Sequence, residues 1–250
     1  MTDIDDLRER IAAACRVVGT LGLTRAATGH ISARLPGTNR VFIRARGPHE
    51  LGVRYTTANE IIEVDLAGKV VDAPPGLLPP SEVFIHTSIL QARPDVMSVV
   101  HVHPPKIVLF TITNTPLKAI FGAYEPAALK LVEDGIPTYP RSVTVTTPEL
   151  GADLVRTMSS KSVCLMKGHG ITTVGRSVED AALTAISLND LAVMTYEANL
   201  LGTPEEISAE DKAYFAKRSD AGRYAEGEPG KPGERAAAVW RYYLTLTGAA

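Results

Sequence analysis

Val99-Val100-His101-Val102-His103-Pro104-Pro105 is the stretch around which the rest of the chain is organised. The run 98–102 is rich in valine, and β-branched side chains favour a pleated, half-buried strand. Alternate residues of a strand share one face, so His101 and His103 point the same way, about 7 Å apart. Proline cannot continue a ladder, and the two prolines therefore end the strand directly after the second histidine. The pattern predicts two imidazoles on one face at the end of a strand.

The composition is that of a soluble globular protein. The 250 residues are 45% hydrophobic and 22% charged, enough to bury a substantial core in one domain or two small ones. With a formal net charge of -2, the chain has no basic field that would attract nucleic acid or an anionic membrane. We therefore expect neither partner, and we expect a small-molecule substrate instead.

The chain also carries no sign of export or of membrane insertion. Its two cysteines, Cys15 and Cys164, are too few and too far apart for a disulfide framework. Residues 1–10 are acidic and amphipathic and lack the apolar core of a signal peptide. No apolar run approaches the roughly eighteen residues that a membrane span needs. These features predict a cytoplasmic protein.

Helical and strand patterns alternate along the chain. Apolar spacing and capping signals predict helices over 4–21 and 81–90, from 147, from 177 towards 200, and around Trp240 near the C-terminus. Short runs of β-forming residues predict strands over 28–34, 41–45, 60–65, 69–72 and 163–166. No internal repeat or domain linker interrupts them. We expect an α/β fold: a three-layer α/β/α sandwich with one mixed sheet covered by helices on both faces.

A divalent metal needs more ligands than two histidines supply. His169 is the natural third, because it lies between two glycines whose missing side chains allow a close approach of backbone and ion. Glu82 is the candidate fourth group, placed in the first turn of its helix, where the helix dipole favours a carboxylate. Two alternatives stay open here: hydrogen-bonded histidines in a core, and an ordinary dipole-matching surface acid.

Four motifs resemble those of the class II aldolase/adducin family, in order and in spacing. They are Pro80-Ser81-Glu82, Ala92-Arg93-Pro94-Asp95-Val96, His101-x-His103-Pro104 and Gly168-His169-Gly170. The resemblance runs from about residue 7 to about residue 201. It implies a mostly antiparallel sheet of about nine strands between helices, in a single domain over 1–250 with a C-terminal helical extension from about 203.

The resemblance also implies roles for individual residues. His101, His103 and His169 would hold one divalent metal ion per subunit, and Glu82 would be a further ligand or an acid/base. Zn²⁺ or Mn²⁺ would suit these donors, as would Fe²⁺ or Co²⁺. Family members are commonly homotetramers whose interfacial sites are completed by a neighbour's tyrosines, which suggests the chain's aromatic residues Tyr124, Tyr242 and Tyr243.

The chain departs from the sugar-phosphate aldolases of that family at the phosphate contacts. Where those enzymes tend to show Gly-Asn, Ser-Gly and Ser-Ser, this chain reads Gly29-His30, Arg46-Gly47 and Pro80-Ser81. A phosphorylated sugar is therefore disfavoured. Arg46 has a planar fork suited to a carboxylate, and His30 or His49 can donate a hydrogen bond or a proton, with Ser81 as a further substrate contact.

The run Arg44-Ala45-Arg46-Gly47-Pro48-His49-Glu50 resembles the branch of the family that decarboxylates hydroxylated aromatic acids such as dihydroxyphthalate. We therefore expect a divalent-metal-dependent carbon–carbon lyase of that type, with Glu82 and His30 as catalytic residues. One alternative is a class II aldolase that performs retro-aldol cleavage. The others are a non-haem iron(II) oxygenase and a non-catalytic adducin-like module.

Overall fold

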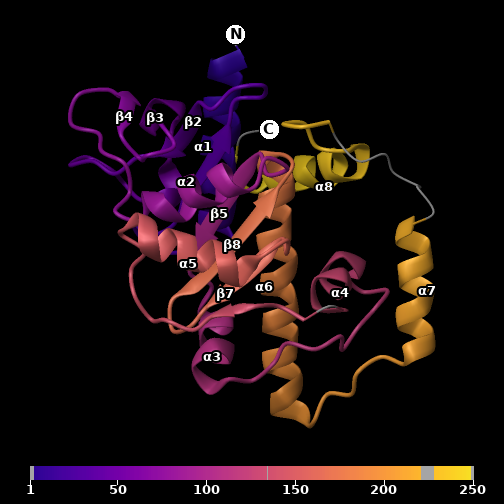
Figure 1. Ribbon diagram of the computed structural model, residues 1–250. Helices are drawn as coiled ribbons and strands as arrows, with labels where there is room; N and C mark the ends of the chain where they lie inside the picture. The colour runs from indigo at the N-terminus through magenta and orange to yellow at the C-terminus, as the bar shows by residue number, and fades with distance from the viewer. Residues whose placement is uncertain (1–2, 134, 221–227, 249–250) are drawn as a thin grey trace.

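The computed structural model describes residues 3–133, 135–220 and 228–248 and contains one mixed sheet (Figure 1). Among these residues the sheet has eight strands in the order β4-β3-β2-β1-β5-β8-β7-β6. Within the described part of the chain, β6 and β7 are the one pair of strands that run parallel. The strand bounds are β1 His30–Arg34, β2 Val41–Arg44, β3 Ile61–Val64, β4 Val70–Asp72, β5 Ser98–Val102, β6 Thr138–Tyr139, β7 Val163–Met166 and β8 Gly170–Gly175.

The sheet thus has eight strands where about nine were expected from the family resemblance. The irregular segments 114–125 and 140–147 form no ladder in the structure. Each contains a proline, Pro116 and Pro140, which cannot donate to a ladder.

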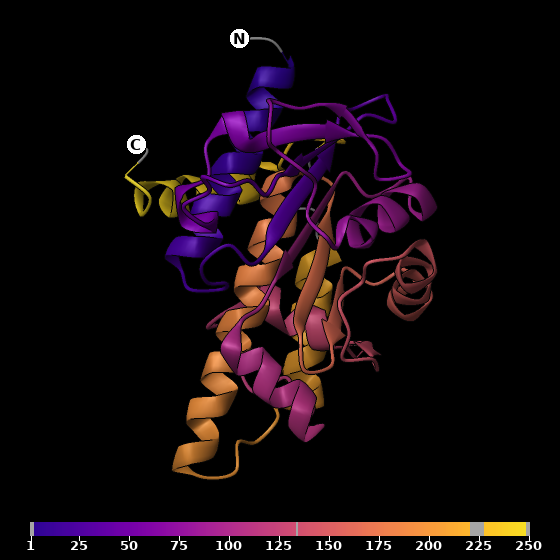
Figure 2. The same ribbon diagram turned by 90° about the vertical axis from the view of Figure 1, so that its left-hand side faces the viewer.

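Helices cover both faces of the sheet, as expected for a three-layer sandwich. The bounds are α1 Asp3–Thr20, α2 Val83–Ala92, α3 Pro105–Thr113, α4 Pro126–Glu133, α5 Pro148–Met158, α6 Val178–Leu201, α7 Ala209–Asp220 and α8 Glu234–Thr245, with short 3-10 helices over Val53–Tyr55 and Ala58–Glu60. Figure 2 shows α1 and α6 on one side of the sheet and α2 and α5 on the other.

The central strand β5 is buried on both faces, which explains its run of valines. Val100 and Val102 pack in the core beneath α1 and α6, whereas Val99 packs in the core beneath α2 and α5. His101 shares the face of Val99, because alternate strand residues point the same way. The strand pattern therefore carries an imidazole into the layer between the sheet and α2.

Most of the expected elements agree with the structure to within one or two residues. The expected helices over 4–21 and 81–90 correspond to α1 and α2, and the helix starts at 147 and 177 are the N-caps of α5 and α6. Sequence patterns missed α3, α4, α7, β6 and β8. Strand β5 ends at Val102, one residue before the expected end at His103, and Pro105 begins α3, since its fixed φ suits the first helical position.

The C-terminal segment returns to the core. Trp240 of α8 is 6% exposed and packs with residues of α1 and α6. The division into one domain with an extension from about residue 203 stays a prediction. Within the described ranges, no helix combines the length and the apolar character that crossing a membrane requires.

Candidate metal centre

His101 sits in the middle of the sheet, where two neighbouring strands fix its ring. It is fully buried, and its backbone is paired with His30 of β1 and with Thr172 of β8. Its Nδ1 lies 3.3 Å from Oγ1 of Thr172, whose own hydrogen goes to Sδ of Met166, also at 3.3 Å. Thr172 therefore accepts a hydrogen bond from Nδ1 of His101. The lone pair of His101 is left on Nε2, the nitrogen that faces the other histidines.

His103 and His169 bring two more imidazoles to the same place. His103 follows the last residue of β5, and its Nε2 lies 2.8 Å from Nε2 of His101. His169 lies in the turn between β7 and β8, with its ring centroid 4.9 Å from those of both His101 and His103. A Cβ on Gly170 would meet the carbonyl oxygen of Val102 at 2.3 Å, so only glycine allows this close approach.

Glu82 supplies the fourth group, but from a position different from the one expected. It is the N-cap of α2 rather than a residue of its first turn, and its side chain does not cap the helix. Instead, Oε1 accepts a hydrogen bond from the backbone N–H of Val145 at 2.8 Å. Oε2 lies 3.5 Å from Nε2 of His101 and 3.4 Å from Nε2 of His169. One ligand atom from each of Glu82, His101, His103 and His169 lies within 4.8 Å of the others.

The protonation states suit a divalent cation. Burial lowers the pKa of His101, and burial together with the neighbouring His101 and His169 lowers the pKa of His103 to about 3. Burial opposes ionisation of Glu82, but His101 and His169 outweigh it and hold the pKa of this carboxyl well below its usual range. Neutral imidazoles beside a carboxylate are the donor set that metal binding requires. The buried Nδ1 of His169 has no hydrogen-bond partner among the described residues.

His30 completes the wall of the site on the β1 side. It is 7% exposed, its ring stacks on that of His101 at 5.0 Å, and its Nε2 lies 3.9 Å from Oε2 of Glu82. Behind it, Nδ1 lies 2.6 Å from Nε2 of His86, and Nδ1 of His86 lies 2.7 Å from Oγ of Ser32. The hydrogen-bonded series Ser32–His86–His30 thus ends at the cluster formed by Glu82, His101, His103 and His169.

The segments that carry this cluster are similar to a known protein family. Residues 9–196 match the family model described as the class II aldolase and adducin N-terminal domain. The chain belongs to this family. Its region of similarity contains all four cluster residues.

Relatives within the class II aldolase and adducin family include enzymes of similar length. The chain is 39% identical over 198 residues to a 3,4-dihydroxyphthalate decarboxylase of Arthrobacter keyseri, covering 78% of this chain and 79% of that one. It is 35% identical over 246 residues to a protein of the same name from Terrabacter sp. (strain DBF63), covering 96% and 97%. An aldolase II superfamily protein from Pseudomonas syringae has the same fold, with a TM-score of 0.83 at 23% identity over 99% of this chain and 94% of that one.

The expected substrate contacts Arg46, His49 and Ser81 are all exposed, and Ser81 directly precedes Glu82 in the sequence. Nε of Arg46 donates to the carbonyl of Pro79 at 3.0 Å, and its backbone pairs with that of Leu78. The loop that carries Arg46 and His49 is therefore joined to the segment leading into Ser81 and Glu82.

The other arginine of the same run, Arg44, is buried and cannot face solvent. Its guanidinium contacts Glu50 at 2.5 Å and donates to Oγ1 of Thr56 at 3.0 Å. It also donates to the carbonyl of Ala27 at 3.2 Å. Arg44 thus fixes both the loop before His30 and the loop of Arg46.

Within one chain the expected tyrosines do not reach the cluster. Tyr124 and Tyr242 are 69% and 62% exposed, and their rings pack on Phe121 and Tyr243. Helix α8 contacts α1 and the first half of α6, whereas α3 begins at the cluster end of the sheet (Figure 1). A role for Tyr242 would therefore need a second subunit.

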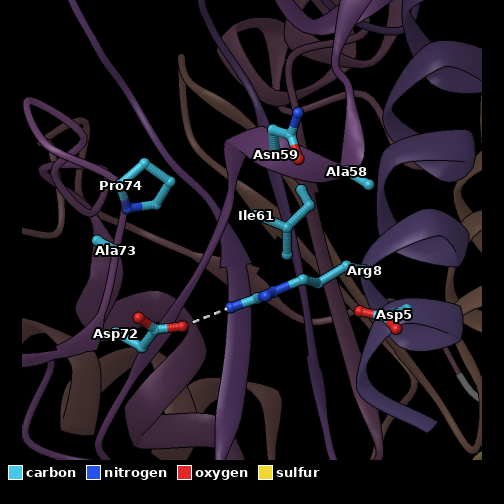
Figure 3. Close-up of a pocket in the computed structure, with 8 residues that line it drawn as sticks. All are labelled: Asp5, Arg8, Ala58, Asn59, Ile61, Asp72, Ala73 and Pro74. Atoms are coloured by element: carbon cyan, nitrogen blue, oxygen red, sulfur yellow. Dashed lines mark hydrogen bonds and ion pairs between the residues drawn. The ribbon is translucent and has the colours of Figure 1, made fainter. Parts of the chain in front are cut away.

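A separate pocket of about 330 Å³ lies between α1 and β4. Figure 3 shows the residues that line it. Arg8 crosses it to Asp72 at 2.8 Å, and none of the cluster residues lines it. We assign it no part in the site.

Sequence reasoning missed His86 and Ser32. A signal for each was present, because His86 is four residues after Glu82 on a helix, and Ser32 is two residues after His30 on a strand.

Proposed function

We propose that this chain is a divalent-metal-dependent carbon–carbon lyase that decarboxylates a hydroxylated aromatic acid of the dihydroxyphthalate type. The observation that carries the proposal is the convergence of Glu82, His101, His103 and His169 on one point. The two relatives at 39% and 35% identity, both named as 3,4-dihydroxyphthalate decarboxylases, support the substrate class.

In this proposal His101, His103 and His169 hold the ion, with Glu82 as a fourth ligand or as an acid/base. The bound cation would act as a Lewis acid that stabilises negative charge on a substrate oxygen beside the reacting carbon. Zn²⁺ or Mn²⁺ is the proposed metal, one per subunit, and Fe²⁺ or Co²⁺ would suit the same donors.

Decarboxylation breaks the bond between the ring and the carboxylate, and the electron pair stays on the ring carbon, which then takes a proton. Glu82 is ionised, so it enters the reaction as a base that can accept the proton of the substrate's hydroxyl. Returning that proton to the ring carbon as carbon dioxide leaves balances the reaction. The hydrogen bond from Val145 holds the carboxylate in place for both transfers.

His30 and Arg46 take the substrate's remaining polar groups. His30 borders the cluster from β1 and can donate a hydrogen bond to a substrate oxygen, which matters most where charge develops in a dry site. Arg46, on the loop joined to Pro79, would bind a carboxylate through its planar fork. His49 and Ser81, from the same rim, are proposed as further contacts.

Two features distinguish this proposal from sugar-phosphate aldol cleavage, which uses the same kind of electron sink. His30 and Arg46 stand where the sugar-phosphate aldolases tend to carry small polar phosphate contacts, and Pro80 replaces a serine. These substitutions favour an aromatic carboxylate over a phosphorylated sugar.

We also propose that the protein is a cytoplasmic homotetramer with sites at subunit interfaces. Tyr124 and Tyr242 are exposed in one chain and so are free to reach a neighbouring subunit's site.

The test is a substrate panel given to protein loaded with zinc or manganese. The panel holds ortho-hydroxylated aromatic dicarboxylates and sugar phosphates, and the assay records carbon dioxide against aldehyde release. We expect carbon dioxide from the dihydroxyphthalates, loss of turnover with a chelator, and recovery when metal returns. Aldehyde release instead would establish a class II aldolase. Oxygen-dependent turnover with iron would establish the oxygenase. If no metal binds on reconstitution, the protein is an adducin-like module.

Two variants then separate metal binding from substrate binding. His103→Ala should lose both bound metal and turnover while the fold remains. Arg46→Ala should keep its metal and raise KM roughly 30-fold, which corresponds to a loss of about 2 kcal/mol of binding energy. Normal activity in either variant would remove that residue from its proposed role.

A further inference from the structure

The two buried hydrogen bonds that join Ser32, His86 and His30 run in one direction, which the Ser32 hydroxyl determines. His86 and Ser32 are both fully buried, so each of their polar atoms needs a partner inside the protein. Among the described residues, the Ser32 hydroxyl has a single polar partner, Nδ1 of His86 at 2.7 Å. A hydroxyl that only accepted there would leave its own hydrogen buried and unsatisfied, at a cost of about 1–3 kcal/mol. Ser32 therefore donates to His86.

The donor role of Ser32 determines the tautomer of His86, which in turn determines the tautomer of His30. Because Nδ1 of His86 accepts, the proton of this neutral ring is on Nε2, which donates to Nδ1 of His30 at 2.6 Å. Nδ1 of His30 is then an acceptor, and the proton of His30 is on Nε2. That nitrogen faces Oε2 of Glu82 at 3.9 Å. At 3.9 Å the two atoms are too far apart for a hydrogen bond, but an ionised carboxylate can only accept, so its position is compatible with a proton on Nε2 of His30.

We propose that His86 is a positioning residue that, with Ser32, fixes His30 as a donor whose Nε2–H points into the site. This inference deepens the proposed function and rests on it for the identity of the acceptor, an oxygen of the aromatic acid. It also excludes His30 from metal ligation, because a protonated Nε2 has no lone pair for an ion. The wrong tautomer of His30 would present a bare nitrogen to a substrate oxygen and repel it.

The fold places the three residues for this purpose. His30 and Ser32 are two apart on β1 and so share the sheet face covered by α2. His86 is four residues after Glu82, on the same side of α2, so one helix supplies both the carboxylate and the positioning imidazole.

The direct test reads the tautomers by long-range proton–nitrogen NMR correlation on protein labelled with nitrogen-15 at its six histidines, metal-free and loaded with zinc. The nitrogen shift separates an N–H nitrogen from a bare one, and exposed His49 serves as an internal reference. We expect His86 and His30 each to carry the proton on Nε2. A proton on Nδ1 of His30 in the wild-type protein would overturn the inference, whether or not any variant folds.

Two replacements of similar shape provide a matched pair. In His86→Gln the side-chain oxygen can accept from Ser32 while the NH₂ donates to His30, so the tautomer of His30 should persist. In His86→Glu the side chain only accepts, which should draw a proton onto Nδ1 of His30. We expect kcat to fall by about 100-fold or more in His86→Glu at unchanged metal content, and by less than about tenfold in His86→Gln.

A purely structural role for His86 would lower stability in both variants and leave the tautomer of His30 as it is. Failure of the proposed function is recognised separately. If no aromatic acid is decarboxylated by the wild-type protein, the proposed reaction fails while the tautomer measurement stands. If the wild-type protein is active but His30 carries its proton on Nδ1, this inference alone fails.

Discussion

Nδ1 of His101, the ring nitrogen that faces away from the cluster, contacts the hydroxyl of Thr172, and that hydroxyl donates to the sulfur of Met166. Such outer contacts set the tautomer and the orientation of a ligating imidazole. Thr172 is fully buried and shares a sheet face with His101, whereas its neighbour Thr173 points to the opposite face and donates to the carbonyl of Ala181 at 2.8 Å. Two adjacent threonines thus make comparable buried hydrogen bonds, and only one of them supports the cluster.

Thr172→Val and Thr173→Val therefore form a matched pair of variants. Each loses a buried hydrogen bond and should cost about 1 kcal/mol of unfolding free energy. Only Thr172→Val should weaken metal binding, by about 10- to 100-fold, measured by zinc titration against a competing chelator. Equal metal affinity in the two variants would show that Thr172 does not act through His101.

At the scale of residues, the four members of the cluster could be predicted from the sequence, whereas the contacts around them could not. The strand period placed His101 and His103 on one face, the flanking glycines and the helix dipole suggested His169 and Glu82, and the family motifs contain the same four residues. The contact of His86 with His30 was not predictable, because it depends on how α2 packs over β1. The place of Tyr242 within the chain was not predictable either, because it depends on how α8 packs against α1 and α6.

At the scale of elements, β8 is confined by a glycine at each end. A Cβ on Gly170 would meet the carbonyl oxygen of Val102 at 2.3 Å and Cδ2 of His103 at 2.8 Å. At the other end, a Cβ on Gly175 would meet the backbone nitrogen of Ala181 at 2.4 Å. The first clash lies against the cluster, and the second lies against the start of α6.

The glycines at the two ends of β8 can therefore be compared by the same substitution. Gly170→Ala and Gly175→Ala should both lower the unfolding free energy, by about 1–3 kcal/mol, because each forces apart closely packed backbone. Gly170→Ala should also displace His103 and reduce bound metal, whereas Gly175→Ala should keep its full metal content. Denaturant unfolding and metal analysis of the two purified variants check this. Equal metal content in both would mean that β8 tolerates movement at its cluster end.

Elements with strong local signals were predictable, and elements that depend on their neighbours were not. The N-caps of α5 and α6 are Thr147 and Ser177, whose side chains accept from the backbone N–H groups of Leu150 and Asp180. These capping signals are visible in the sequence. The two-residue strand β6 has no such signal, since the strand that pairs with it is β7, where Leu165 lies twenty-seven positions after Thr138. The expected ninth strand came from the resemblance alone and has no counterpart in the described residues.

At the scale of the whole molecule, one arginine joins three distant parts of the chain. Arg10 of α1 makes a two-pronged contact with Glu179 of α6, at 2.8 and 2.7 Å, and donates to the carbonyl of Gly230 at 2.7 Å. The Glu179 side chain is 4% exposed, so this ion pair is largely removed from water. The pair between Arg8 of the same helix and Asp72 of β4 is the contrasting case, because its acid is 63% exposed. Figure 3 shows this pair.

The last prediction uses that contrast. Glu179→Ala removes the buried acid of Arg10 and leaves its guanidinium with the longer 3.9 Å contact to the half-exposed Asp6. We expect a loss of about 3 kcal/mol of unfolding free energy. For a chain of this size that corresponds to a melting temperature lower by roughly 6–12 °C.

Two further variants serve as controls. Asp72→Ala should cost less than about 1 kcal/mol, since exposed pairs contribute little. The double variant Arg10→Met with Glu179→Leu should recover much of the loss, because it removes the poorly compensated charge together with its partner. Thermal unfolding of all three variants checks this, with zinc content as the control that the distant cluster is intact. If Glu179→Ala and Asp72→Ala have the same melting temperature, the contact of Arg10 with Glu179 is not what holds α1, α6 and the C-terminal segment together.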